Sequence, residues 1–166
     1  MVLTRIVLVL AFVVACGGKA PTADTTAPSA PTAASKVLVL VDDQGVGLGG
    51  NDPIAYATDN AAVAGSAEHS SQHGGATYRF ASAEHKATFD GAPAKHAPQY
   101  GGYCAFAASQ SRLSEADPTV FQIVDGQLLV FTNADYKDQF NKDVAGNKQK
   151  ADQNWPGLVA RYGKYR

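Results

Sequence analysis

The sequence lacks several features on which common functions depend. Lysine and arginine number 14 against 15 aspartates and glutamates, and no basic run is present. This balance argues against nucleic acid or an anionic membrane surface as a partner, because both attract a basic excess. The patterns Cys-x-x-Cys, Gly-x-Ser-x-Gly and His-Glu-x-x-His are also absent, which removes three common catalytic motifs. We detect no internal repeat.

The apolar run near the start is too short to cross a bilayer, which takes roughly 20 residues. It extends from Ile6 to Val14, follows a single positive charge, and has the length of a signal-peptide core. It ends in Val-Val-Ala-Cys16, which resembles the lipobox of bacterial lipoproteins. We therefore predict a signal peptide over 1–15 and a lipidated, palmitate-type anchor on Cys16. More than one acyl chain on a cysteine gives stable membrane attachment.

The next segment contains almost only Gly, Ala, Pro, Ser and Thr. Such a composition cannot bury apolar surface, so 16–35 is predicted to be a disordered tether that begins at the lipidated cysteine. The remaining part, 36–166, has enough residues for one domain with a single core. The anchor would hold this domain at the cell envelope, facing the periplasm. Gly17 stands where an aspartate usually signals inner-membrane retention, which favours the outer membrane.

Short β-rich runs separated by turn residues predict an α+β domain of antiparallel hairpins and a few short helices. The strongest local signal is Asp125-Gly126 between two such runs, a pattern typical of a type I′ hairpin. Asp52 before Pro53 predicts a helix start. Pro156 is expected to kink or split the last helix. The predicted elements are a hairpin over 37–48, a helix over 53–57, strands within 68–81, a helix over 83–90 capped by Ser82, a hairpin over 120–131, a helix to about 142 capped by Asn133, and a helix over 148–162.

One cysteine, Cys104, remains in the predicted domain, in a compartment where cysteines usually pair. Three explanations stay open: burial as a small hydrophobic residue, a metal bond, or a reactive thiol. The other metal-ligand candidates are His69, His73, His85 and His96. A thiolate with imidazoles suits copper or zinc.

Three segments resemble the YHS domain family. They are Asp-Pro-Ile-Ala-Tyr at 52–56, the segment 75–89 around Tyr-Arg-Phe-Ala-Ser-Ala-Glu-His, and Tyr-Gly-Gly-Tyr-Cys at 100–104. The resemblance is to the exported, single-domain branch, and it implies a small strand-and-helix module that binds heavy metals. The two cysteines of metal-transport relatives are replaced here by Ala81 and His85. The resemblance therefore points to a metal site with Cys104 and His85, and His73 is added as a predicted ligand because it lies just before the central strand, across the turn. His96 is interpreted as surface variation and His69 as solvated.

Three functions follow from these observations. The first is capture or transfer of a copper-like ion, or zinc, at the envelope. The second is a non-catalytic module that binds another envelope protein through its aromatic residues, with Cys104 purely structural; the candidates are Tyr100, Tyr103, Phe106 and Trp155. The third is an enzyme in which a cysteine and a histidine form a nucleophile and base pair. The missing motifs make the third the least favoured, and we predict no catalytic residue.

Overall fold

The computed structural model describes residues 35–165. The predicted signal peptide, the lipidation site and nearly all of the tether lie outside these residues. The described chain has an α+β fold, as predicted. Its elements, in order, are β1 (Lys36–Val37), the 3-10 turn η1 (Leu48–Gly50), α1 (Ala55–Thr58), β2 (Ser66–His73), β3 (Ala76–Phe80), α2 (Ala83–Gly91), α3 (Pro93–His96), η2 (Gln99–Gly102), α4 (Ala105–Ser109), β4 (Asp117–Val124), β5 (Gln127–Phe131), α5 (Ala134–Asn141), α6 (Val144–Tyr162) and β6 (Lys164–Tyr165).

The strands form three antiparallel pairs, β2 with β3, β4 with β5, and β1 with β6. Two of these pairs are tight hairpins. Asp125 and Gly126 both have positive φ, at 51° and 75°, as a type I′ turn requires. Gly74 and Gly75 adopt the same conformation, with φ of 57° and 86°. The predicted type I′ hairpin is therefore confirmed, and the other hairpin turns in the same way.

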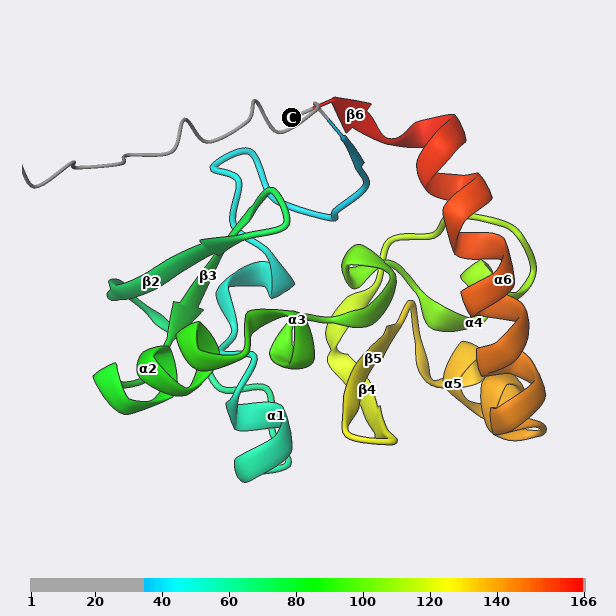
Figure 1. Ribbon diagram of the computed structural model, residues 1–166. Helices are drawn as coiled ribbons and strands as arrows, with labels where there is room; N and C mark the ends of the chain where they lie inside the picture. The colour runs from blue at the N-terminus through cyan, green and yellow to red at the C-terminus, as the bar shows by residue number, and fades with distance from the viewer. Residues whose placement is uncertain (1–34, 166) are drawn as a thin grey trace, which may run out of the picture. The chain divides into compact units, whose positions relative to one another are not determined.

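The described chain contains an internal repeat that we did not detect in the sequence. Residues 48–91 and 99–141 each contain a 3-10 turn, a short helix, a hairpin and a capped helix, in that order. In Figure 1 the first set of elements lies at the left and the second at the centre and right. We call these segments the first and second repeats. Their sequences differ too much for composition alone to reveal the relationship.

The strand registers show how closely the repeats correspond. In the first hairpin Ser66 pairs with Phe80, and a bulge follows before Ser70 pairs with Arg79. In the second hairpin the pair Asp117 and Phe131 is followed by the same bulge. Across the hairpins the spacing is 51 residues, from 66 to 117 and from 80 to 131, whereas the turns that precede them are 52 residues apart, from 48 to 100. Each repeat also begins with three consecutive left-handed residues that end in Gly-Gly, namely Leu48-Gly49-Gly50 and Tyr100-Gly101-Gly102.

Each repeat contributes most of one of two hydrophobic clusters. One cluster gathers Phe80 and Phe89 of the first repeat. The other gathers Phe131 and Phe140 at the corresponding positions of the second, with Leu158 of α6 packed on them. β5 serves both, since Val130 belongs to the first cluster and Leu129 to the second. Burial of these side chains on both sides of β5 joins the repeats into one domain.

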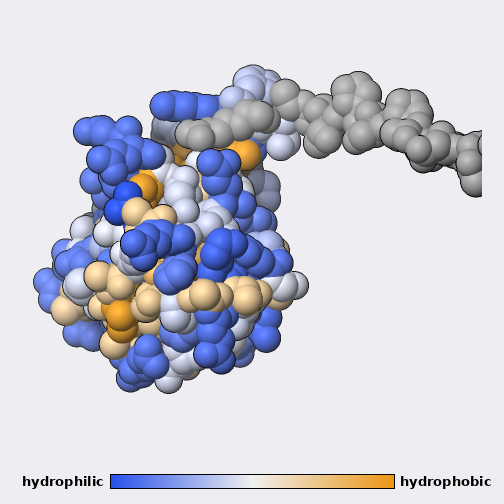
Figure 2. Space-filling model, turned by 90° about the vertical axis from the view of Figure 1, so that its left-hand side faces the viewer, coloured by the Kyte–Doolittle hydropathy of each residue, from blue (hydrophilic) through white to orange (hydrophobic). Residues whose placement is uncertain are grey.

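The face on the β2 and α2 side, shown in Figure 2, is mainly hydrophilic, with only small hydrophobic patches. Polar side chains dominate β2 itself, whose sequence is Ser-Ala-Glu-His-Ser-Ser-Gln-His. A broad apolar docking surface is therefore absent from this face of the described residues.

Two predicted elements differ from the structure. The hairpin over 37–48 is reduced to a single bridge between Val41 and Gly47, because β1 pairs with β6 instead. The last helix is not split at Pro156: α6 is one element that begins at Val144. An interior proline costs about 3 kcal/mol. The burial of Ala151 and Leu158 on either side of Pro156 offsets this cost.

Buried tyrosines make the fold sensitive to high pH. Burial raises the pKa of Tyr78 to about 12, and burial also raises the pKa of Tyr56 and of Tyr100. In the unfolded chain these phenols release their protons near pH 10. The stabilisation is therefore complete below about pH 10 and is lost as the pH rises toward 12. We expect the thermal unfolding midpoint to fall steeply over this range.

The Tyr78→Phe variant should have a weaker pH dependence, since it removes one of the raised pKa values. The measurement is thermal unfolding by circular dichroism at a series of alkaline pH values, with phenolate absorbance followed in parallel. Phenolate absorbance that develops fully near pH 10 while the fold is retained would contradict the prediction.

Candidate functional site

A buried carboxylate lies at the start of the first repeat. Asp52 is 0% exposed. Its Oδ1 accepts a hydrogen bond from the Ile54 N–H at 2.8 Å. The predicted cap is wrong in position, because α1 begins at Ala55 and its N-cap is Ile54, which makes no side-chain cap bond. The Oδ2 of Asp52 accepts a second hydrogen bond from the Ala81 N–H at 2.8 Å, just after β3. The carboxylate thus joins the start of α1 to the end of the first hairpin.

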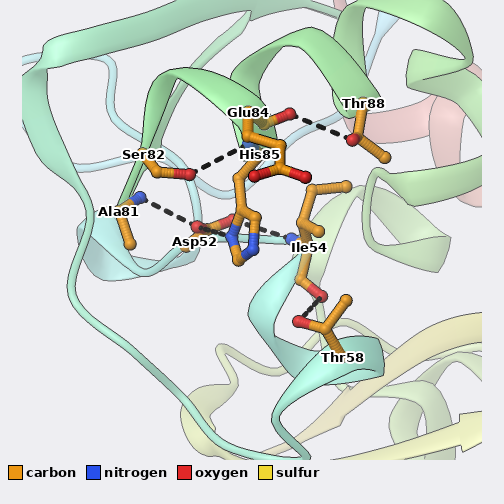
Figure 3. Close-up of polar contacts among 8 residues, drawn as sticks. All are labelled: Asp52, Ile54, Thr58, Ala81, Ser82, Glu84, His85 and Thr88. Atoms are coloured by element: carbon orange, nitrogen blue, oxygen red, sulfur yellow. Dashed lines mark hydrogen bonds and ion pairs between the residues drawn. The ribbon is translucent and has the colours of Figure 1, made fainter.

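The third partner of this carboxylate is His85. Ser82 caps α2 by accepting a hydrogen bond from the His85 N–H, so the histidine lies in the first turn of the helix. Its Nδ1 lies 2.6 Å from Asp52 Oδ2. Figure 3 shows the imidazole pointing from α2 down onto the carboxylate, with Ala81 and Ile54 on either side. The side chain of His85 is 23% exposed, against none for Asp52. The pair therefore connects the interior to the surface.

This geometry leaves one nitrogen of the imidazole available. When the ring is neutral, the proton lies on Nδ1, toward the carboxylate, and Nε2 carries a free lone pair. Among residues 35–165, Nε2 of His85 has no hydrogen-bond partner. A carboxylate behind an imidazole is the usual support of a metal-ligating histidine, because it fixes the ring and makes Nε2 more basic. The same arrangement could hold a proton acceptor in catalysis, but that would also need a nucleophile or substrate beside it.

The second repeat is an internal control for the structural role of this pair. Cys104 corresponds to Asp52, since its N–H bonds the Ser114 carbonyl as the Asp52 N–H bonds that of Val63. Tyr136 corresponds to His85, since its N–H bonds the cap residue of α5. Tyr136 packs against Phe106, with ring centroids 5.5 Å apart. The same local fold is therefore built without a carboxylate or an imidazole.

Cys104 lies in the core. It is 0% exposed and packs with residues such as Leu129 and Phe140 in the cluster of the second repeat. Asp52 and His85 lie instead beside the other cluster, next to Ile54 and Phe80. The structure does not bring the thiol and the imidazole into a common group. Cys104 is a free cysteine, and its surroundings are those of a small hydrophobic residue.

The other histidines are also separate. His73 ends β2, and its ring meets the edge of Phe89 with centroids 6.1 Å apart. It borders a cavity of about 330 Å³ that is also lined by Tyr100 and Trp155. His69 lies in β2 and is half-buried. His96 ends α3, where burial and, to a smaller extent, the Lys95 charge lower its pKa.

No group of three or more His, Cys, Asp or Glu side chains is placed to hold a metal ion within the described part of the chain. The predicted set of Cys104, His85 and His73 is therefore not assembled there. Sequence reasoning favoured a helix cap for Asp52, with a ligand role as the lesser alternative, and it missed the bond to His85. The residues next to Asp52 in the sequence do not indicate this bond, because Asp52 and His85 are 33 positions apart and meet only after the hairpin folds.

Among residues 35–165, no helix combines the length and the apolar character needed to cross a membrane. The comparisons with known proteins found no matching family model, no matching curated protein and no matching solved structure. The candidate site is therefore defined by the geometry of Asp52 and His85 alone.

Proposed function

We propose that this chain is a membrane-anchored lipoprotein of the bacterial cell envelope whose YHS-like domain binds a copper-like metal ion for capture or transfer. The observation that supports the proposal is the buried Asp52 carboxylate bonded to Nδ1 of the part-exposed His85. Because the second repeat folds without such a pair, the fold alone does not account for it. The anchor at Cys16 and the resemblance to the YHS family supply the location and the ligand class.

His85 is the metal ligand of this proposal, and Asp52 is its supporting residue. Imidazole suits copper and zinc among the common metals. Cys104 has a structural role, because its thiol lies in the core and is 0% exposed. His73 is not part of the same site. One protein ligand holds an ion weakly, so the remaining ligands come from water or from a donor or acceptor molecule. An incomplete ligand shell of this kind suits transfer better than storage.

The domain has no catalytic role in this proposal. A nucleophilic thiol must meet its substrate, and Cys104 would require the core to open first. The non-catalytic interaction module remains the alternative if metal binding fails. It would then depend on partner-binding surfaces that do not include the Asp52–His85 pair.

We expect Cu(II) or Zn(II) to bind the purified protein with one-to-one stoichiometry. His85→Ala should abolish this binding, because it removes the only proposed protein ligand. Asp52→Asn should weaken it by about 10–100-fold, as loss of a supporting carboxylate usually does. The measurement is calorimetric titration of the reduced protein, with Cu(I) titrated beside the two divalent ions.

Three variants serve as controls. Cys104→Ala and His73→Ala should bind metal as the parent does. His85→Tyr places the residue of the second repeat at this position while Asp52 is kept, and it should fold but bind no metal. Absence of binding above background in the parent would refute the proposal. If Cys104→Ala lost metal binding while its fold was retained, the Cys104 thiol would be a metal ligand.

A further inference from the structure

A polar groove lies between β4 and α5, and neither Asp52 nor His85 is among its lining residues. It has a volume of about 690 Å³ and is lined by residues of three elements and by Asn60 of the loop after α1. Gln122 and its neighbours Phe121 and Ile123 come from β4, Lys137 and Asn141 from α5, and Val144 from the start of α6. The groove thus combines a cation and three side-chain amides with half-buried apolar side chains.

Two features of this groove lack partners. Gln122 Oε1 is buried and has no hydrogen-bond partner, which is unusual for a buried polar atom. Within the described residues, Lys137 Nζ makes no ion pair or hydrogen bond, and neither does the side-chain amide of Asn141. Lys137 is half-buried as a residue, and an ammonium without a counter-charge favours an anion from outside the chain.

The first repeat shows which anion fits. At the corresponding positions, Lys86 Nζ lies 2.5 Å from Asp90 Oδ2, and Ser71 Oγ donates to Asp90 Oδ1 at 2.6 Å. The bond from Lys86 is also the main cause of the lowered pKa of Asp90. The first repeat therefore holds a carboxylate between its strand and its helix.

The second repeat keeps the cation of this arrangement but lacks its carboxylate. At the spacing of 51 residues, Lys86 corresponds to Lys137, Ser71 to Gln122, and Asp90 to Asn141. The Lys137 ammonium and the Gln122 amide can both donate hydrogen bonds, as the lysine and serine do in the first repeat. The buried Gln122 oxygen would in turn accept a hydrogen bond, such as one from a peptide N–H.

We propose that the groove binds an acidic side chain of a partner polypeptide, with its carboxylate held by Lys137 and Gln122 as Asp90 is held in the first repeat. Phe121, Ile123 and Val144 favour apolar residues on either side of the acidic one. The partner's backbone can supply the donor that Gln122 Oε1 lacks. The ligand is therefore an acidic residue within an apolar stretch, and the site is independent of metal binding at His85.

The test is an NMR titration of the isotope-labelled full chain, in mild detergent, with the probe peptide acetyl-Leu-Glu-Leu-amide. We expect saturable shifts of the amide signals of β4 and α5. The peptide acetyl-Leu-Gln-Leu-amide should bind about tenfold more weakly, because it loses the charge-assisted hydrogen bonds. Lys137→Ala should weaken the binding of the Glu peptide to the same extent.

Two substitutions move the internal carboxylate from one repeat to the other. Asn141→Asp supplies an internal carboxylate to Lys137 and should block peptide binding. Asp90→Asn removes the carboxylate that Lys86 binds. In this variant the Glu peptide should also shift the amide signals of β2 and α2. Lys86→Ala, whose lysine already has a partner, should leave binding at β4 unchanged. Equal binding of the Glu and Gln peptides, unchanged binding in Lys137→Ala, or equal saturation by acetate would overturn the proposal.

Discussion

Replacing Asp52 with alanine is expected to lower the free energy of unfolding by about 2–4 kcal/mol, because each buried N–H group that loses its acceptor costs about 1–3 kcal/mol. The carboxylate is 0% exposed and accepts hydrogen bonds from the N–H groups of Ile54 and Ala81. His85 provides the third contact. Alanine leaves these donors unpaired and opens a cavity beside Phe80. Denaturant unfolding with linear extrapolation measures the change.

Asp117 offers a matched control for this prediction. Its carboxylate also accepts a hydrogen bond from a backbone N–H two residues ahead, that of Thr119, but the side chain is exposed. Asp117→Ala should therefore cost about 0.5 kcal/mol or less. If Asp52→Ala destabilised no more than Asp117→Ala, the buried carboxylate would not join α1 to the first hairpin as described.

The Cys104 thiol is expected to react at least about a thousandfold more slowly in the folded protein than in denaturant. The thiol is 0% exposed within a packed cluster, so an alkylating reagent reaches it only when the core opens. For a protein with typical stability, fully unfolded molecules are rarer than about one in a thousand. Maleimide labelling followed by peptide mass spectrometry measures the rate at Cys104 separately from any reaction at Cys16.

Ala67→Cys supplies an exposed thiol on β2 as the control, and it should react at the rate of a small-molecule thiol. Fast labelling of Cys104 in the folded parent would contradict its assignment to the core. Such a result would also reopen the interpretation of Cys104 as a metal ligand or a reactive thiol.

The two positions tested in these experiments are equivalent in the repeats. Asp52 and Cys104 each precede a short helix, and the backbone N–H of each is bonded to a carbonyl in the loop that follows. One carries a buried charge and the other a buried thiol. The same local fold therefore carries a polar pair, Asp52 and His85, in the first repeat and a buried thiol, Cys104, in the second. This comparison explains why the pair in the first repeat is a site candidate, since folding succeeds without it.

The sequence predicted correctly those features that depend on residues within a few positions of one another, namely two helix caps and a hairpin turn. Ser82 and Asn133 cap α2 and α5 through side-chain hydrogen bonds, as their positions before the helical segments indicated. Asp125-Gly126 forms the type I′ turn, because both residues accept a positive φ. The α+β class followed from these signals. Cys104 stayed undecided among three roles, because exposure of a side chain is not a local property.

Three results depended on the tertiary structure. Asp52 meets His85 only because the first hairpin brings α2 back onto the start of α1. The repeat was hidden because burial and strand register, rather than residue identity, are what its two halves share. Pro156 lies within one continuous helix because packing of α6 against the second repeat offsets its local cost.

The sequence by itself determined the caps, the turns and the fold class, since these depend on neighbours within a few positions. The tertiary structure decided which side chains meet, and therefore which of the predicted ligands are separate. Contacts between residues far apart in the chain are set by the packing of whole elements, to which many side chains contribute together. For that reason the carboxylate behind His85, and the unpaired lysine of the second repeat, became visible only in the folded chain.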